Sequence, residues 1–235
     1  MSYEEILADL KSKLTDDIKE NDTMLRKEAE KFAKAKNADG VKAAGELLVK
    51  NMPEEEAEEI KRITHLDGVR LDVMHNKIVE MINNHSSIEA KPLAERLYKK
   101  IIVDFKEGEK AKFVSTRNPF EDNLIQILFK QDKILNRAPF DLATYLTTYA
   151  YILTETGSPF DAIPVLQKAI EFNPVDCGPM FELAEVYKLL GNRKKLFEIT
   201  RDTIKVASSP VALARCYTNI GYILIDSQDY DDAAA

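Results

Sequence analysis

The chain of 235 residues is long enough for one or two domains with a hydrophobic core. Its composition is 45% hydrophobic and 31% charged, with eight glycines and nine prolines, which excludes a disordered chain and favours long helices. A net charge of −7 argues against nonspecific nucleic-acid binding, because an acidic surface repels phosphate. There is no signal-peptide pattern, no 18-residue apolar run and no CxxC pair, so we expect a cytoplasmic protein that does not span a membrane.

Residues 1–106 are predicted to form a helical N-terminal region. Ser2 and Glu5 have the spacing of a capping box, which begins the first helix. The apolar stripe of this helix has one member every four residues: Ile6, Leu10, Leu14 and Ile18. Helices at about 22–36 and 41–50 are expected to pair as a hairpin, which is either a divergent repeat or a plain helical layer.

Two further helices are expected before residue 106. Pro53 begins a long one, which runs to about Ile82 with a possible break at Asp67-Gly68. The other runs from about Lys91 to Phe105. The stretch from Lys91 to Arg117 holds eight basic and four acidic residues. We interpret this charge as a solvated helix face and the loop that follows it, since no nucleic-acid-binding motif accompanies it.

Residues 107–139 are predicted to be a connecting loop and helix. The stretch up to Asn118 contains glycine and has no helical periodicity, which indicates a loop. A helix is expected after Pro119, with apolar positions that continue as far as Leu135. No strict alternation of apolar and polar residues and no convincing two-residue hairpin turn is found, so no sheet is expected anywhere.

The sequence repeats itself after Phe140. Ala150 and Ala184 are 34 residues apart, and so are Gly157 and Gly191. A third unit contains Tyr217, Ile220, Gly221, Leu224, Tyr230 and Ala233. Two equal spacings of 34 residues indicate helical hairpins, in which glycine ends the first helix and small residues allow close helix packing.

These units resemble the tetratricopeptide repeat family over about residues 140–235. The segment Ala169–Pro174 is similar to the closing signature of the repeat, and Asp229–Ala233 is similar to the opening of its second helix. The resemblance implies an all-α fold, a solenoid of helical hairpins at about 140–173 and 176–207 with an incomplete third repeat. It also implies that Ala150 faces Ala162. The second unit departs from the pattern at three positions: Leu196, Thr200 and Thr203.

No pattern in the sequence indicates catalysis, a cofactor or a metal. The three histidines lie at steps of ten residues, so they do not share one helix face, and we interpret them as partly exposed: His65, His75 and His85. No carboxylate pair is isolated in an apolar setting, and no phosphate loop, GxSxG or HExxH motif occurs. We therefore expect a protein that is not an enzyme and needs neither cofactor nor metal.

The resemblance implies a groove lined by the first helix of each repeat. The matching groove positions are Thr147, Tyr151, Phe181, Glu185, Lys188, Arg215, Asn219 and Tyr222. Aromatic, arginine and amide side chains suit peptide recognition. The family's clamp for C-terminal carboxylates is not expected here, because its places hold Thr147, Tyr151 and Glu182, with only Arg215 basic.

The leading interpretation is a scaffold that binds a protein or peptide partner through this groove. An alternative is a bacterial regulator whose repeats sense a peptide, but the first 62 residues hold 16 acids against 12 bases and no clear DNA-recognition helix. A third possibility is a repeat segment of a longer multidomain protein. The last helix has an apolar side, with Tyr217, Ile220 and Leu224, that lacks a hairpin partner. This predicts either a continuing chain or self-association of two copies.

Overall fold

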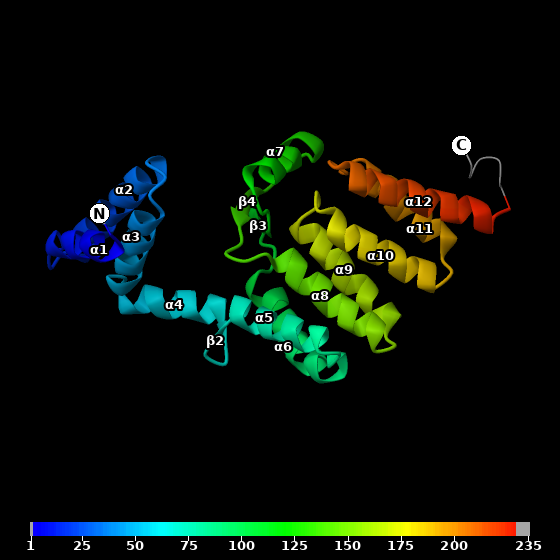
Figure 1. Cartoon of the computed structure of the whole chain (residues 1–235), viewed down its shortest axis with the longest axis horizontal. Coiled ribbons are helices and arrows are strands. Elements are labelled where there is room, and N and C mark those ends of the chain that lie inside the picture. The colour runs from blue at the N-terminus through cyan, green and yellow to red at the C-terminus, as the bar shows by residue number, and fades with distance from the viewer. Residues whose placement is uncertain (1, 229–235) are drawn as a thin grey trace. The chain divides into compact units, whose positions relative to one another are not determined.

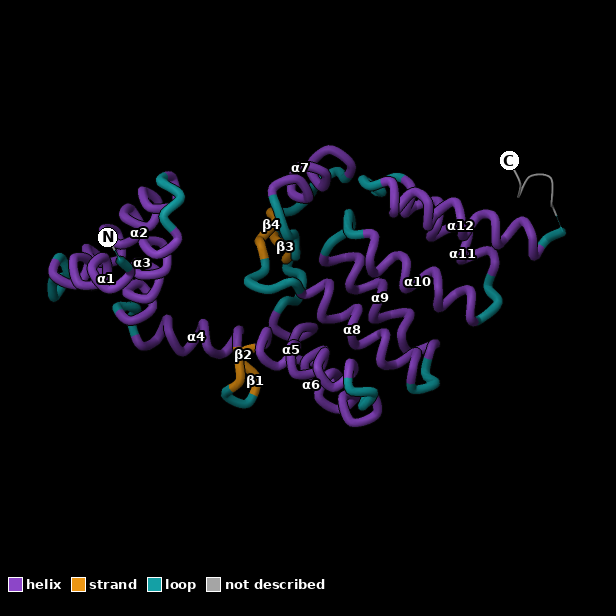
Figure 2. Tube along the Cα trace, viewed as in Figure 1, coloured by secondary structure: helices purple, strands orange, loops and turns teal. Residues whose placement is uncertain are grey.

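The computed structural model describes residues 2–228 and is mainly helical (Figures 1 and 2). The predicted all-α class is confirmed. The chain divides into two compact units, Met1–His65 and Leu66–Ala235, which are described in turn. The predicted opening of a further repeat helix, with Tyr230 and Ala233, lies outside the described residues.

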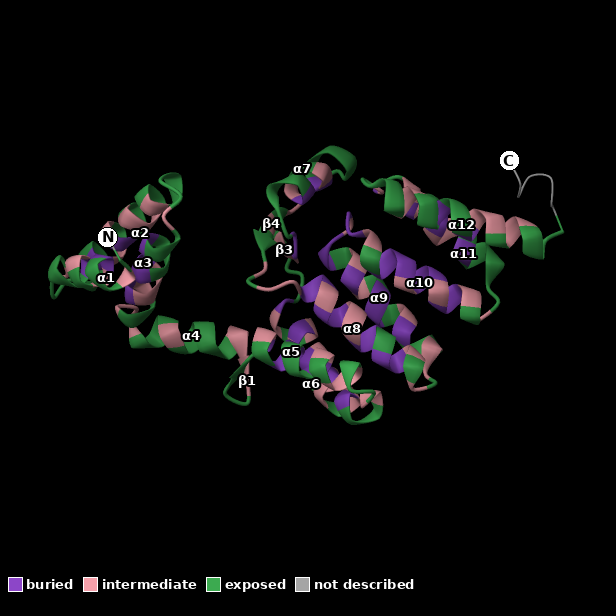
Figure 3. Ribbon diagram, viewed as in Figure 1, coloured by how far each residue is buried: buried purple, intermediate pink, exposed green. Residues whose placement is uncertain are grey.

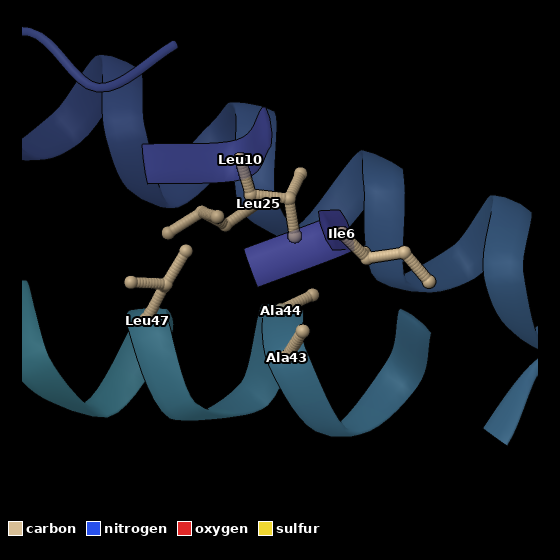
Figure 4. Packing of buried hydrophobic residues seen from close by; sticks show 6 residues of the cluster. All are labelled: Ile6, Leu10, Leu25, Ala43, Ala44 and Leu47. Atoms are coloured by element: carbon tan, nitrogen blue, oxygen red, sulfur yellow. The ribbon is translucent and has the colours of Figure 1, made fainter. Parts of the chain in front are cut away.

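The first unit contains four helices: α1 (Tyr3–Ser12), α2 (Ile18–Lys34), α3 (Ala38–Lys50) and α4 (Glu54–Thr64). Its core joins α1, α2 and α3 and consists of Ile6, Leu10, Leu25, Ala43, Ala44 and Leu47 (Figure 4). The expected capping box at the start of α1 is present. The helices near 22–36 and 41–50 are confirmed as the α2–α3 pair.

The prediction that Ile18 belongs to the first helix is wrong. Helix α1 ends at Ser12, and Ile18 begins α2 with a side chain that is 45% exposed. The cause is Asp17, whose carboxylate accepts hydrogen bonds from the amides of Lys19 and Glu20 and so caps a new helix. The four-residue spacing of apolar side chains continued to Ile18 by chance, across the turn between α1 and α2.

Two glycines in α3 differ in their surroundings. A methyl group at Gly40 would lie 2.3 Å from Cγ of Phe32, so α2 can approach α3 this closely only because Gly40 has no side chain. A methyl group at Gly45 would have nothing within 4 Å. The close approach lets the α2–α3 hairpin bury Ala43 and Ala44 completely.

Alanine at these two positions is expected to change stability in opposite directions. Gly40→Ala should destabilise the protein by about 1 kcal/mol, because a clash of about 2 kcal/mol outweighs the helix-propensity gain of about 1 kcal/mol. Gly45→Ala receives the gain alone and should stabilise by about 1 kcal/mol. Urea denaturation of both variants measures the difference, and equal shifts of both midpoints would contradict the close contact with Phe32.

A tight turn interrupts the long helix predicted from Pro53. Helix α4 ends at Thr64, two short strands follow, β1 (His65–Leu66) and β2 (Val69–Arg70), and α5 begins at Leu71. Asp67 and Gly68 have φ angles of 52° and 75°. Two consecutive positive φ angles define the type I′ turn that Asp-Gly favours. The expected break is confirmed, whereas the expectation that no two-residue hairpin turn occurs is wrong.

The second unit stacks helical hairpins. Its long helices are α5 (Leu71–Asn83), α6 (Ser87–Asp104), α8 (Leu142–Glu155), α9 (Pro159–Phe172), α10 (Cys177–Leu189), α11 (Arg193–Ile204) and α12 (Pro210–Asp226). The predicted hairpins at 140–173 and 176–207 are confirmed as α8–α9 and α10–α11. Helix α6 packs against α8 as α9 packs against α10. The α5–α6 pair therefore takes the place of a preceding repeat, which the sequence did not reveal.

Small residues and glycines hold the hairpins together as expected. Ala150 in α8 and Ala162 in α9 are both 0% exposed, and α8 and α10 are the most extensively buried helices of this unit (Figure 3). Gly157 and Gly191 follow these helices with φ angles of 80° and 65°, a region in which only glycine is unstrained. In the second hairpin Leu196 is buried instead of a small residue, yet α10 still packs against α11.

A strand–helix–strand segment lies between α6 and α8. Strand β3 (Ala111–Val114) pairs in parallel with β4 (Ile134–Arg137), and α7 (Pro119–Leu128) connects them. The expectation of a loop without any sheet is therefore wrong, and so is a helix that reaches Leu135. Helix α7 ends where Phe129 takes extended backbone angles, and the Gln131 side chain donates hydrogen bonds to the carbonyls of Ile125 and Phe129.

Candidate functional site

A groove of about 350 Å³ opens on the face of the stack formed by α8, α10 and α12. We call it the α8–α10–α12 groove. Its lining side chains come from the segment before α7, from α8, from the start of α10 and from α12: Arg117, Thr144, Thr147, Thr148, Tyr151, Asp176, Gly178, Pro179, Glu182 and Arg215. Three of the predicted groove residues, Thr147, Tyr151 and Arg215, are among them.

Helix α8 presents a polar row to the groove. Thr144, Thr147, Thr148 and Tyr151 follow the i, i+3, i+4, i+7 spacing that places residues on one helix face. The hydroxyls of Thr147 and Thr148 donate to the carbonyls of Ala143 and Thr144, at 2.8 and 3.0 Å. The Thr147 oxygen therefore keeps its lone pairs as acceptors for a ligand, and the Thr148 oxygen keeps one, because His75 lies 2.9 Å from it and uses the other. Tyr151 is 40% exposed at the end of the row.

Arg215 of α12 lies across the groove from this row. Its guanidinium sits over the Phe181 ring, 4.5 Å from the centroid. The Glu182 and Glu185 carboxylates are 3.9 and 3.8 Å away, which is longer than a hydrogen bond. Burial raises the pKa of Glu182, the Arg215 charge lowers it in part, and Glu185 raises it further. The Phe181 ring therefore holds the Arg215 guanidinium in place, and the N–H groups of Arg215 can still donate hydrogen bonds to a ligand.

A second cluster next to Arg215 is centred on Lys188. The Lys188 ammonium donates to the Glu185 carboxylate at 3.0 Å and to Asn219 Oδ1 at 3.1 Å, and it lies 5.1 Å from the centre of the Tyr222 ring. Asn219 is 2% exposed, and its Nδ2 has no hydrogen-bond partner within residues 2–228. This cluster ties α10 to α12.

The structure thus places the eight predicted residues in two adjoining groups. Thr147, Tyr151 and Arg215 line the groove. Phe181 and Glu185 of α10 lie beside Arg215 without lining it, and Lys188, Asn219 and Tyr222 form the neighbouring cluster. The sequence missed Arg117 and Asp176. Arg117 lies outside the repeats, so no repeat spacing could have found it. Asp176 caps α10 at the start of the predicted hairpin, and Thr144 and Thr148 were accessible from the helical period.

A charge network around the buried Glu121 adjoins the groove, which Arg117 and Asp176 of this network also line. The carboxylate of Glu121, 6% exposed, accepts from the backbone amide and the side chain of Arg117, both at 2.8 Å, and from Asn173 Nδ2 at 2.9 Å. Arg117 also lies 3.1 Å from Asp176 at the start of α10. Burial raises the pKa of Glu121, but the hydrogen bonds from Arg117 and Asn173 outweigh it, so the pKa lies below its ordinary value.

His75 is buried, which corrects the expectation of a partly exposed histidine. It is 8% exposed, stacks on Tyr145 with ring centroids 4.2 Å apart, and has Nε2 2.9 Å from the Thr148 hydroxyl. That hydroxyl donates to Thr144, so the His75 Nε2–H is the donor of the pair. Burial lowers the pKa of His75, and the negative charge of Asp141 offsets part of this shift. Burial also raises the pKa of Tyr145 to about 12.

The buried His75 is expected to make stability depend on pH. Its folded pKa lies below the unfolded value of about 6.5, so the unfolded chain binds more protons in that window. This contribution is fully present above about pH 6.5 and is lost as the pH falls below it. His75→Gln should flatten the slope of unfolding free energy between about pH 5 and 7.5. His85→Gln, at an exposed site, is the control, and equal slopes in both variants would contradict the assignment.

No group of three or more histidine, cysteine, aspartate or glutamate side chains within residues 2–228 is placed to hold a metal ion. None of the described helices has the length and apolar character needed to cross a bilayer.

The sequence matches no family model and no curated protein. Two crystal structures of MamA are similar to the chain. One aligns with a TM-score of 0.48 and 14% identity, over 91% of this chain and 86% of the other. The second aligns with a TM-score of 0.47 and 16% identity, over 88% of both chains. The class of the fold, a stack of tetratricopeptide-like helical hairpins, follows from the helices described above.

Proposed function

We propose that this chain is an interaction scaffold that binds a peptide segment of a partner protein in the α8–α10–α12 groove, without catalysis of its own. The observation that carries the proposal is the groove itself, which gathers Thr147, Tyr151 and Arg215 from two separate helices. Its other charged side chains, such as Arg117, are engaged in ion pairs. The pairing of Arg117 with Glu121 and Asp176 holds this surface in shape.

The lining side chains suit a peptide backbone with one acidic and one apolar side chain. Threonine lone pairs on α8 can accept from peptide N–H groups, and Arg215 can donate to a carboxylate or a carbonyl. The exposed ring of Tyr151 offers apolar area to a side chain. Arginine and tyrosine at the centre of an interface are the residue types that most often dominate binding energy.

The test is a screen of the full chain against a synthetic library of 12-residue peptides, followed by titration of the peptides that bind. Tyr151→Ala and Arg215→Ala should each weaken binding by about 1–2 kcal/mol, or roughly five- to thirtyfold. The matched controls are Tyr217→Ala, 64% exposed on α12, and Arg201→Ala on α11. They should leave the affinity unchanged.

Two results would contradict the groove as the binding site. In the first, no peptide of the library binds the wild-type chain. In the second, the peptides that bind lose as much affinity in the controls as in the groove variants. Circular dichroism of each variant separates loss of binding from loss of folding, because the protein is mainly helical.

A further inference from the structure

Two carboxylates lie beside Arg215, and only one of them lines the α8–α10–α12 groove. The Glu182 carboxylate is 3.9 Å from the Arg215 guanidinium, and that of Glu185, three residues later on α10, is 3.8 Å from it. Glu182 is a lining residue with a side chain that is 36% exposed, whereas Glu185 is not among the lining residues. A ligand in the groove therefore meets the carboxylate of Glu182.

The two carboxylates also differ in their partners. Both oxygens of Glu185 accept from the Lys188 ammonium, at 3.0 and 3.2 Å. Among residues 2–228 no hydrogen bond reaches the Glu182 carboxylate, and Arg215 is its one ion-pair partner, at a distance too long for a hydrogen bond. Burial outweighs this attraction and holds the pKa of Glu182 above its ordinary value. The negative charge of Glu182 is therefore only partly compensated.

A ligand that binds Arg215 takes this partner away from Glu182. A guanidinium that turns to a carboxylate of the ligand leaves Glu182 without its counter-ion, which is unfavourable for a partly buried carboxylate. The ligand carboxylate also brings a second negative charge close to Glu182, and like charges repel more strongly where water is partly excluded. A ligand that carries its own cation next to its acidic group restores the balance of charge.

The threonine row on α8 suits the donors of such a cation. The Thr147 hydroxyl donates to the Ala143 carbonyl at 2.8 Å, and the Thr144 hydroxyl donates to the Asp141 carboxylate at 2.8 Å. With their hydrogens placed in this way, the two oxygens line the groove as acceptors. A lysine ammonium has three donors and no acceptor, so it can bond to Glu182 and to an oxygen of this row together.

We infer that the peptide segment in the α8–α10–α12 groove carries a basic side chain that pairs with Glu182, close to the acidic side chain that pairs with Arg215. The ion pair between Glu182 and Arg215 is thereby exchanged for two pairs with the ligand. Its loss costs little, because exposed pairs contribute little to stability. Glu182 then determines specificity, since it selects segments in which opposite charges are neighbours. The inference rests on the proposed function and adds a second charge to the ligand of that site.

The test compares two pools of 12-residue peptides that are acetylated and amidated at their ends. Each peptide of the first pool has one aspartate and, within the next four positions, one lysine. The second pool has glutamine in place of the lysine, and the remaining positions of both pools are varied among uncharged residues. The full wild-type chain at fixed salt should bind the lysine pool about three- to fivefold more tightly, the upper range for a partly exposed ion pair.

Glu182→Gln keeps the shape of the side chain and removes its charge, so this variant should bind both pools equally. Glu182→Lys reverses the charge and should reverse the preference. Glu198→Gln is the matched control, because the Glu198 side chain on α11 has a similar exposure of 34% and lies outside the groove. This control should retain the preference of the wild-type chain.

Three results would overturn the inference. If the wild-type chain binds both pools equally, the groove does not recognise the basic side chain, while the proposed function stands because peptides still bind. If Glu198→Gln loses as much of the preference as Glu182→Gln, lysine is attracted by the acidic surface as a whole, since the net charge of the chain is −7. If neither pool binds, the proposed function fails together with the inference.

Discussion

Replacement of Asn173 by leucine is expected to destabilise the second unit by about 2–4 kcal/mol. Asn173 is 0% exposed, and its Nδ2 donates to the Glu121 carboxylate at 2.9 Å and to the Ser115 carbonyl at 3.3 Å. Leucine has a similar volume but no donor. The variant leaves a buried carboxylate short of one hydrogen bond, worth about 1.5–3 kcal/mol, and a carbonyl without its side-chain partner. Urea denaturation at neutral pH measures the loss.

The same variant gives a second readout in acid. Because the pKa of Glu121 is depressed in the folded state, its contribution to stability is present above the unfolded pKa and is lost as the pH falls through the folded value. Asn173→Leu removes one cause of the depression, so the difference from wild type should shrink at low pH. Asn136→Leu, at an exposed position of β4, is the control. A loss no larger than that of the control would refute the network.

Ala150→Leu is expected to lower the free energy of unfolding by about 3 kcal/mol. Ala150 is 0% exposed in α8, which packs against α9, and there Ala162 is also 0% exposed. Three added heavy atoms at this contact must displace a helix or force strained side-chain rotamers, at a typical cost of about 1–3 kcal/mol. Ala184, 1% exposed at the equivalent position 34 residues later, should respond similarly. Thermal denaturation followed by circular dichroism measures both variants.

An exposed alanine on a helix of the same stack supplies the control. Ala214 on α12 is exposed, and Ala214→Leu should leave the midpoint within about 0.5 kcal/mol of wild type, as surface changes usually do. Equal losses in Ala150→Leu and Ala214→Leu would mean that close helix contact is not what makes the small residue necessary. A loss confined to Ala150 and Ala184 supports the register of the repeat.

The hairpins of the stack could be predicted because local rules and the repeat agree there. Gly157 and Gly191 end helices with positive φ angles, and the alanines at 150 and 184 are buried at the same place in successive hairpins. Each of these features depends on a few neighbouring residues and recurs at a fixed spacing. A pattern that is local and repeated can be read from one sequence.

The missed elements depend on contacts between distant residues. Strand β3 reads as a loop because only four residues pair, and their partners in β4 lie 23 positions later, from Ala111 to Ile134. The α5–α6 pair joins the stack through α8, across the intervening segment 105–141, which has no counterpart between the later repeats. No local period could reveal either contact.

The residues of the candidate site could likewise be predicted only where they belong to the repeats. Thr147, Tyr151 and Arg215 could be placed from the repeat register, and all three line the groove. Arg117 could not, because a segment outside the repeats brings it there. A cavity between β3 and the ends of α6, α7 and α9 was missed for the same reason. Its wall combines residues from four segments that only the folded chain brings together.

The segment between α6 and α8 has a consequence for the order of folding. Hairpins such as α8–α9 close a short loop, whereas α6 reaches α8 only after the ends of residues 105–141 come together. Closing a longer loop costs more chain entropy, and folding rates fall as contacts become less local. We therefore expect α8–α9 and α10–α11 to nucleate folding and α5–α6 to dock late. Destabilising changes in α6 should then accelerate unfolding and leave the refolding rate nearly unchanged.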